Sequence, residues 1–205
     1  IPSSLVGSEM CIRDRDLCGV KPFVRVSSNN EVEIKKVLDF GAKGIIVPMV
    51  NNIEDVKKAI TSSFYPPEGR RGMGLYRAQG YGDEKKKAEY INSSAHDIEI
   101  YVNIESKEAV ENIHEIFASD ISGYFLGPYD LSASIGNPGK FETIEFIDIE
   151  KKILKAAEKY NILTGIHIVE PKNEDLSQKV SNGYDLIAFS VDFRMLETIA
   201  RKPFE

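Results

Sequence analysis

The chain has 205 residues, of which 42% are hydrophobic and 28% charged, and its formal net charge is −6. This length is enough to bury the core of one domain, and the composition is that of an ordinary soluble globular protein. The charge gives no basic footprint for nucleic acid, and no apolar run approaches the roughly 20 residues that cross a bilayer. We therefore expect one soluble domain that binds neither nucleic acid nor membranes.

The amino-terminal part of the sequence carries two signals. Cys11 and Cys18 lie close together without the spacing of a disulfide framework or a zinc site, which favours a reducing compartment. The segment also lacks the basic and apolar regions of a secretory signal, so we expect a cytoplasmic protein. Residues 1–15, IPSSLVGSEMCIRDR, have no initiator methionine and no clear period. We interpret them as a doubtful, non-native head or a flexible natural tail, and assign residues 16–205 to a partial barrel domain.

From residue 21 onward, short apolar runs alternate with charged, helix-like stretches. The predicted strands are KPFVRV (21–26), GIIVPMV (44–50), IEIYVNIE (98–105), GYFLG (123–127), LTGIHIV (163–169) and DLIAFS (185–190). Helices are predicted between them, with asparagine or serine at several starts and glycine at several ends. The segment 65–90, rich in Gly, Pro and Arg, is predicted to be a long loop, and such loops are often functional.

Strands that are continuously apolar are typical of a parallel sheet covered by helices. An open doubly wound sheet usually carries a glycine-rich phosphate turn after its first strand, and VRVSSNN is not such a turn. A (β/α)8 TIM barrel has eight units in about 250 residues. The six units found here predict an α/β TIM barrel that lacks its first two β/α units, with a native chain that begins upstream.

Polar residues follow several predicted strands at their carboxyl ends, where the active site of a parallel α/β fold forms. They are Arg25, Asn103, Glu105, the turn from Gly127 to Asp130, and His167. Carboxylate oxygens suit Mg²⁺ or Mn²⁺, and two of them leave coordination positions for water and substrate. An arginine beside two carboxylates therefore indicates a divalent cation and an anionic substrate.

Each of these residues also has a structural interpretation. Glu105 and Asp130 are both placed to favour the start of the helix that follows, and a helix cap and a metal ligand do not exclude each other. Arg25 would need a strong partner inside an apolar strand, and a carboxylate can be that partner. His167, between two isoleucines, has the surroundings of a core histidine.

From about residue 21 to its end, the chain resembles the HpcH/HpaI aldolase family, the metal-dependent class II pyruvate aldolases. The matching segments are FVRVSSNN, VLDFGAKGIIVPMVNN, YPPEGRRGMG, YVNIESKEAVENI and GYFLGPYDLSASIG. The resemblance implies a (β/α)8 barrel that reversibly cleaves a 4-hydroxy-2-oxo acid to pyruvate, or a similar 2-oxo acid, and an aldehyde. It also implies a homo-oligomer, commonly a hexamer.

The resemblance assigns roles to individual residues. Glu105 and Asp130 would bind a divalent cation, Mg²⁺, Mn²⁺ or Co²⁺. Arg25 would stabilise the enolate-like transition state, and Asp39 would pair with the family's catalytic histidine. The residues it places at the substrate are Asn103, Tyr129, Asp130, Arg71 and His167. Backbone N–H groups near Tyr129 would hold the pyruvate carboxylate at a helix start, and Arg71 is either structural or close to the substrate.

Two departures from the family pattern matter. The family commonly has glutamine where this sequence has Asn103. Its general base is a histidine in a D-x-E-H segment, and the given chain contains no such segment. Two alternatives therefore stay open: an acyl-CoA lyase of the malyl or citryl type, for which the sequence shows no basic cluster suited to CoA, and a non-catalytic module that binds a 2-oxo acid.

Overall fold

The computed structural model describes residues 3–204, without the side chains of residues 3–8 and 94–96. Within this range, six strands form one parallel sheet in which each strand pairs with its neighbour in sequence. The strands are β1 (Phe23–Arg25), β2 (Gly44–Val47), β3 (Glu99–Ile104), β4 (Gly123–Leu126), β5 (Leu163–Ile168) and β6 (Leu186–Phe189). The six predicted strands and the parallel α/β class are confirmed.

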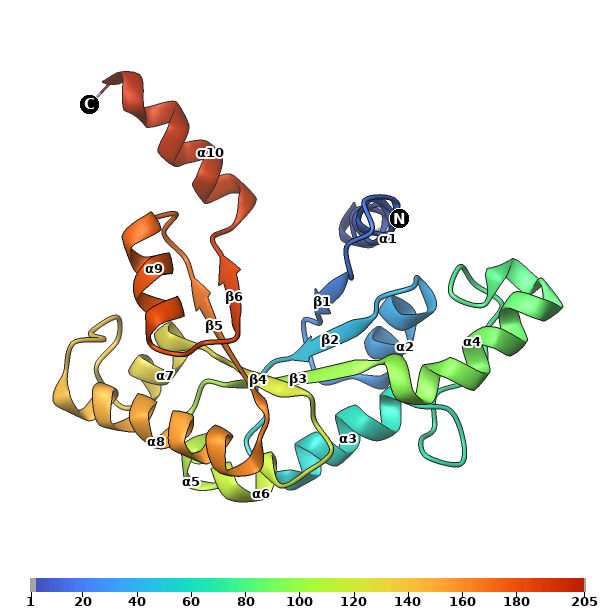
Figure 1. Cartoon of the computed structure of the whole chain (residues 1–205), viewed down its shortest axis with the longest axis horizontal. Coiled ribbons are helices and arrows are strands. Elements are labelled where there is room, and N and C mark those ends of the chain that lie inside the picture. The colour runs from blue at the N-terminus through green and yellow to red at the C-terminus, as the bar shows by residue number, and fades with distance from the viewer. Residues whose placement is uncertain (1–2, 205) are drawn as a thin grey trace.

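Helices occupy most of the chain between the strands (Figure 1). They are α1 (Ser3–Leu17), α2 (Glu31–Asp39), α3 (Ile53–Ser63), α4 (Glu84–Asp97), α5 (Lys107–Glu111), α6 (Ile113–Phe117), α7 (Pro128–Ser134), α8 (Ile144–Tyr160), α9 (Asn173–Ser181) and α10 (Asp192–Arg201). Short 3-10 turns cover Gly80–Gly82 and Lys202–Phe204. None of the helices in the described part of the chain combines the length and apolarity needed to cross a membrane.

Local capping explains where several helices begin. The Asn30 side chain accepts hydrogen bonds from two amides of α2, and Asn52 and Ser106 do the same for one amide each in α3 and α5. These caps satisfy amides that have no partner within the helix. The helix predicted between the strands 98–105 and 123–127 is interrupted at Asn112, so it forms α5 and α6 instead.

The prediction of a long loop over residues 65–90 is only half right. Residues 65–79 are irregular, but α4 begins at Glu84. The Asp83 side chain accepts a hydrogen bond from the Lys86 amide, which supplies the missing N-cap. Lysine, glutamate and alanine are good helix formers, and their propensity outweighs the turn-rich composition before them.

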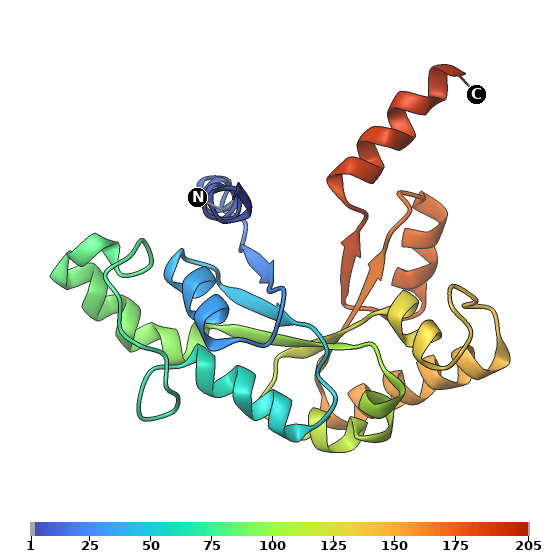
Figure 2. The ribbon, with the colours of Figure 1, turned by 180° about the vertical axis from the view of Figure 1, so that it is seen from behind.

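The sheet curls into half of a barrel, with β1 and β6 at its two edges (Figures 1 and 2). In both views α3, α5, α6 and α8 lie on one side of the sheet, and α1 and α10 extend to the other. The core lies under the first group of helices: Ile45, Val47, Val102 and Ile104 are buried there together with the apolar faces of α3, α6 and α8. This arrangement is consistent with a TIM-barrel-like fold.

Among the described side chains of the first helix, those of Ile12 and Asp16 contact the rest of the fold. Ile12 is 2% exposed and belongs to the hydrophobic core. Asp16 forms an ion pair with Arg77, at 2.6 Å between its Oδ2 and Arg77 Nη2. The domain boundary at residue 16 stays a prediction, although the helix around it is packed on the domain.

Candidate active site

The polar residues singled out at the strand ends lie at one end of the sheet. Because the strands are parallel, the carboxyl ends of β1, β3, β4 and β5 all lie at this end. The register also places Arg25, Asn103 and His167 on one face, since paired residues share a face and every second residue returns to it. That face is the concave one, opposite the helix-covered core.

Glu105 is held firmly just beyond β3. Glu105 is 4% exposed. Its Oε1 accepts a hydrogen bond from the Met49 amide at 2.7 Å, and its Oε2 accepts one from Asn103 Nδ2 at 3.0 Å. Met49 has φ +54, a left-handed conformation that is unusual for a non-glycine residue. The backbone after β2 is thus turned so that its N–H meets the carboxylate of the neighbouring strand.

Gly127 leaves the space in which the Glu105 carboxylate lies. A Cβ atom at Gly127 would be 2.8 Å from Glu105 Cβ and 2.9 Å from Oε2. The φ of Gly127 is −96, so the requirement is for space rather than for a special conformation. The close approach of the β4 and β3 strand ends therefore depends on a residue without a side chain.

Replacing Gly127 with alanine is expected to displace the Glu105 carboxylate and to cost about 1–3 kcal/mol of unfolding free energy, as overpacking does. The matched control is Gly72→Ala, whose added Cβ would meet only Lys35 Cε, at 3.4 Å. Urea unfolding of both variants checks this. Equal stabilities would show that the strand ends adjust without cost.

Asp130 lies in the first turn of α7 and is exposed. No side-chain hydrogen bond caps α7, and no hydrogen bond or ion pair joins the Asp130 carboxylate to the rest of the described chain. A side-chain cap is thus not formed, although an acid in this turn still favours the helix dipole. Its neighbour Tyr129 is 49% exposed and packs edge-on against Phe141, with ring centroids 5.0 Å apart.

The donor set of Glu105 and Asp130 fits a hard divalent cation. Each Glu105 oxygen accepts one hydrogen bond and keeps acceptor capacity, while the Asp130 carboxylate is unpaired within the described residues. No group of three or more His, Cys, Asp or Glu side chains suited to a metal occurs among these residues. Two carboxylates with the remaining positions left to water and substrate is an arrangement that Mg²⁺ accepts.

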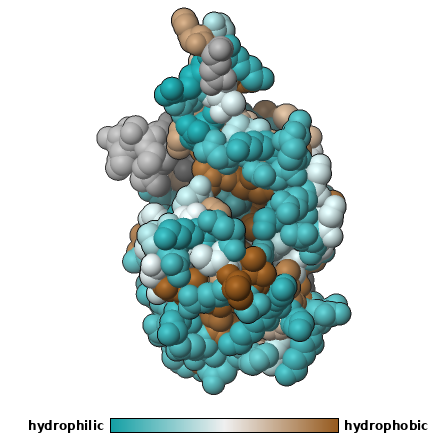
Figure 3. Space-filling model, turned by 90° about the vertical axis from the view of Figure 1, so that its left-hand side faces the viewer, coloured by the Kyte–Doolittle hydropathy of each residue, from teal (hydrophilic) through white to brown (hydrophobic). Residues whose placement is uncertain are grey.

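Arg25 and His167 both remain accessible. Arg25 is exposed at the end of an edge strand, and no ion pair joins it to the described residues, so pairing with a carboxylate does not explain it. His167 is half-buried and lines, with Tyr129, a cavity of about 750 Å³ between α8 and α9. Figure 3 views the molecule from the side where these helices lie and shows hydrophobic surface exposed between hydrophilic areas. His167 is therefore not enclosed in the core.

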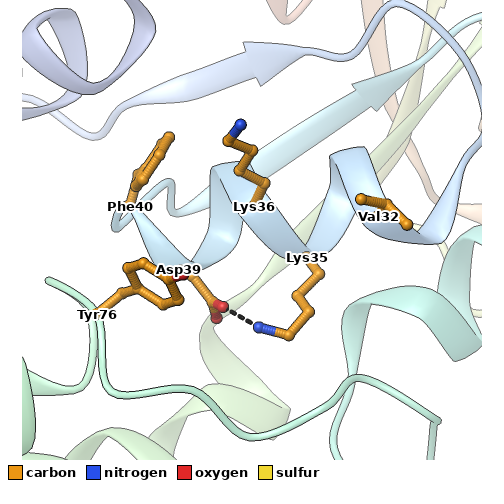
Figure 4. A pocket seen from close by; sticks show the side chains of 6 residues that line it. All are labelled: Val32, Lys35, Lys36, Asp39, Phe40 and Tyr76. Atoms are coloured by element: carbon orange, nitrogen blue, oxygen red, sulfur yellow. Dashed lines mark hydrogen bonds and ion pairs between the residues drawn. The ribbon is translucent and has the colours of Figure 1, made fainter. Parts of the chain in front are cut away.

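Asp39 lies at the opposite end of the sheet, near the amino ends of the strands. It ends α2, which runs from the carboxyl end of β1 to the amino end of β2, about 13 Å for nine residues. Asp39 is buried, and its carboxylate accepts hydrogen bonds from Arg71 Nη2 at 2.7 Å and Gln79 Nε2 at 3.0 Å. Lys35 forms a further ion pair with it (Figure 4). The structure thus does not bring Asp39 together with Glu105.

Arg71 is the centre of this second cluster, and its side chain is 0% exposed. Its guanidinium lies over the ring of Tyr65, 4.8 Å from the centroid, and donates to the Tyr90 hydroxyl at 3.0 Å. Burial opposes the charge, but Tyr90 and the hydrogen bond to Asp39 outweigh it and raise the pKa of Arg71. Of the two interpretations of Arg71, the structural one agrees with this placement.

Gln79 and Met49 are site residues that the sequence analysis missed. Gln79 donates to Asp39 and to the Tyr65 hydroxyl, at 2.8 Å for the latter, and is 1% exposed. A glutamine within a glycine-rich segment gives no local signal of burial. For Met49, the Pro preceding it marks a turn after β2, but not the direction of its amide.

Comparison with known proteins shows the relationships of the chain. The profile of the HpcH/HpaI aldolase/citrate lyase family matches residues 10–197. The 5-keto-4-deoxy-D-glucarate aldolase of Enterobacter sp. (strain 638) is 33% identical over 183 residues, which cover 88% of this chain and 70% of that protein. The enzyme of the same name from Shigella dysenteriae serotype 1 (strain Sd197) is 32% identical over the same shares.

Solved structures give the same picture of the fold. An HpcH/HpaI aldolase from Desulfitobacterium hafniense DCB-2 is 25% identical, with a TM-score of 0.87, and the match covers 96% of this chain and 75% of that one. A family protein from Burkholderia cenocepacia J2315 is 24% identical, with a TM-score of 0.90 over 100% of this chain and 80% of that one. The citrate synthase SbnG is 23% identical, with a TM-score of 0.79 over 100% of this chain and 82% of that one.

Proposed function

Since the chain belongs to the HpcH/HpaI aldolase/citrate lyase family of carbon–carbon lyases, we propose that it cleaves a 4-hydroxy-2-oxo acid to pyruvate, or a similar 2-oxo acid, and an aldehyde. The observation that carries the proposal is the orientation of the Glu105 carboxylate by two hydrogen-bond donors. This carboxylate lies at the same end of the sheet as Asp130 and Arg25. The substrate that names the two relatives, 5-keto-4-deoxy-D-glucarate, is itself a 4-hydroxy-2-oxo acid when it is numbered from its keto end.

In this proposal the chain binds the 2-oxo acid and stabilises its enolate. A divalent cation (Mg²⁺, Mn²⁺ or Co²⁺) held by Glu105 and Asp130 would supply a Lewis acid for the 2-oxo group. Arg25 adds fixed positive charge where the enolate oxygen develops, which lowers the barrier. The first amides of α7, at Tyr129 and Asp130, have no partner within the helix and donate hydrogen bonds to the substrate carboxylate in this proposal.

Asn103 and His167 have further roles in the proposed site. Asn103 donates to Glu105 Oε2 and so orients this carboxylate. His167, on the same face of the sheet, faces the aldehyde half of the substrate. Neither residue supplies the general base that must deprotonate the 4-hydroxyl group.

The base belongs, in this proposal, to two further β/α units that close the barrel between β6 and β1. Both edges of the six-stranded sheet offer unpaired backbone groups for such strands. The resemblance pairs the base with Asp39. Within one chain, however, Asp39 and Glu105 lie at opposite ends of the sheet. We therefore expect the histidine that meets Asp39 to come from a second copy, in the homo-oligomer that the resemblance implies. We also propose that this enzyme acts in the cytoplasm, because its two cysteines lack the spacing of a disulfide framework.

Decarboxylation of oxaloacetate tests the enolate-stabilising half without the base. It yields the pyruvate enolate directly, with no hydroxyl to deprotonate. The chain with Mg²⁺ or Mn²⁺ is expected to release pyruvate faster than the metal alone, and Arg25→Ala to lower that excess rate about a hundredfold. Lys21→Ala, which changes a lysine just before β1 that pairs with Glu99, is the control. A rate equal to that of free metal would overturn the proposal.

The second candidate is a module that binds the 2-oxo acid without reaction. The unpaired state of Asp130 in the described residues suits it as well as the lyase, because both need metal and substrate carboxylate. Calorimetric titration with pyruvate and Mn²⁺ distinguishes them. Binding without any decarboxylation of oxaloacetate favours the module.

A further inference from the structure

Four lysines form a basic stripe on the outer surface of α8. Lys155 follows Lys151 by four residues and Lys152 by three, and Lys159 follows Lys155 by four, which brings these side chains to one side of the helix. Together with His114 of α6 they line a groove of about 490 Å³. The sequence analysis found no basic cluster, because these lysines are interspersed with the apolar and acidic residues of an amphipathic helix.

The positive charge of this groove is not paired by ion pairs within the described residues. None of the four lysines forms an ion pair within the described part of the chain, whereas lysines elsewhere, such as Lys179 with Glu150, do. Lys152 donates to the Val110 carbonyl oxygen at 3.3 Å, and Lys159 lies over the ring of its neighbour Tyr160. Lysine side chains three and four residues apart on a helix are neighbours whose charges repel one another, so an anion between them is favoured.

The groove also contains one acidic residue, Asp148, which precedes the stripe. The lining therefore carries four positive charges against one negative charge, before His114 is counted. This local excess stands in a chain whose net charge is −6. A hollow with one sign of charge concentrates small counter-ions more effectively than a flat surface does.

We propose that this groove binds the polyphosphate group of a small molecule. Lysine ammonium groups are point charges that bind phosphate oxygens from several directions. The stripe from Lys151 to Lys159 is about 12 Å long, so its flexible side chains can converge from several directions on one chain of linked phosphates. A nucleic acid duplex would need a longer basic surface, and the remaining charge of the chain would repel it. The site lies on the helix-covered side of the sheet, away from Glu105, and does not rest on the proposed lyase activity.

Calorimetric titration of the chain with inorganic triphosphate at low salt tests the proposal. The variant Lys152→Gln/Lys155→Gln/Lys159→Gln is expected to bind triphosphate at least about tenfold more weakly, from the summed loss of exposed charge contacts. The matched control changes Lys85, Lys86 and Lys87 of α4 to glutamine, which removes the same net charge outside the groove. This control is expected to bind as the unchanged chain does.

Three outcomes would overturn the proposal. An equal loss in both triple variants would show that triphosphate senses only the net charge. No measurable binding to the unchanged chain would remove the site altogether. Tighter binding of a DNA duplex than of triphosphate would assign the groove to nucleic acid. Circular dichroism of each variant confirms that α8 and α4 remain helical, so that lost binding is not lost folding.

Discussion

Replacing Glu105 with alanine is expected to lower the rate of oxaloacetate decarboxylation by the chain about a hundred- to a thousandfold. The change removes the one buried carboxylate of the proposed cation site, and it leaves the Met49 amide and the Asn103 side chain without their acceptor. Binding of Mn²⁺ alone, followed by electron paramagnetic resonance, is expected to weaken in parallel. The two measurements together separate loss of the cation from loss of a later step.

Glu99→Gln is the matched control for this prediction. Glu99 lies at the amino end of the same strand, β3, and thus at the opposite end of the sheet. It forms an ion pair with Lys21 at 2.9 Å. Its replacement is expected to leave the decarboxylation rate and the Mn²⁺ affinity within about twofold, because it is remote from the carboxyl ends of the strands. Full activity of the Glu105→Ala variant would refute the assignment of the carboxyl end of the sheet as the active site.

Replacing Arg71 with alanine is expected to destabilise the chain by about 3–5 kcal/mol, as breaking a buried ion pair from one side does. Asp39 would keep Gln79 and Lys35, but it would lose the fully buried guanidinium 2.7 Å away. The rings of Tyr65 and Tyr90 would lose the cation packed on them, which leaves a cavity. Urea unfolding followed by circular dichroism measures the loss.

Arg77→Ala shows how much of that loss is due to burial. Arg77 lies in the same irregular segment and also pairs with an aspartate, Asp16, but both side chains are partly exposed. Exposed ion pairs contribute at most about 1 kcal/mol, so this variant is expected to unfold at nearly the original urea concentration. Equal destabilisation by the two changes would show that burial of the Arg71 ion pair does not increase its contribution to the free energy of unfolding.

Much of the fold could be predicted from the order of residue types. Apolar runs such as GIIVPMV gave the parallel strands, and Asn30, Asn52 and Ser106 gave the helix starts. These signals are local: a strand buried on both faces needs apolar side chains along its length, and a helix start needs an oxygen acceptor. The gathering of Arg25, Glu105 and Asp130 at one end of the sheet followed from strand direction alone.

The sequence by itself thus determined the order of strands and the end of the sheet at which the candidate site lies. Only the tertiary structure decided which side chains meet, because the contacts join segments far apart in the chain. Asp39 meets Arg71 and Gln79 at the far end, and Glu105 takes its hydrogen bond from Met49, 56 residues before it. Gly127 likewise becomes essential only when β4 lies beside β3, since no local pattern records the space that a neighbouring strand's carboxylate requires.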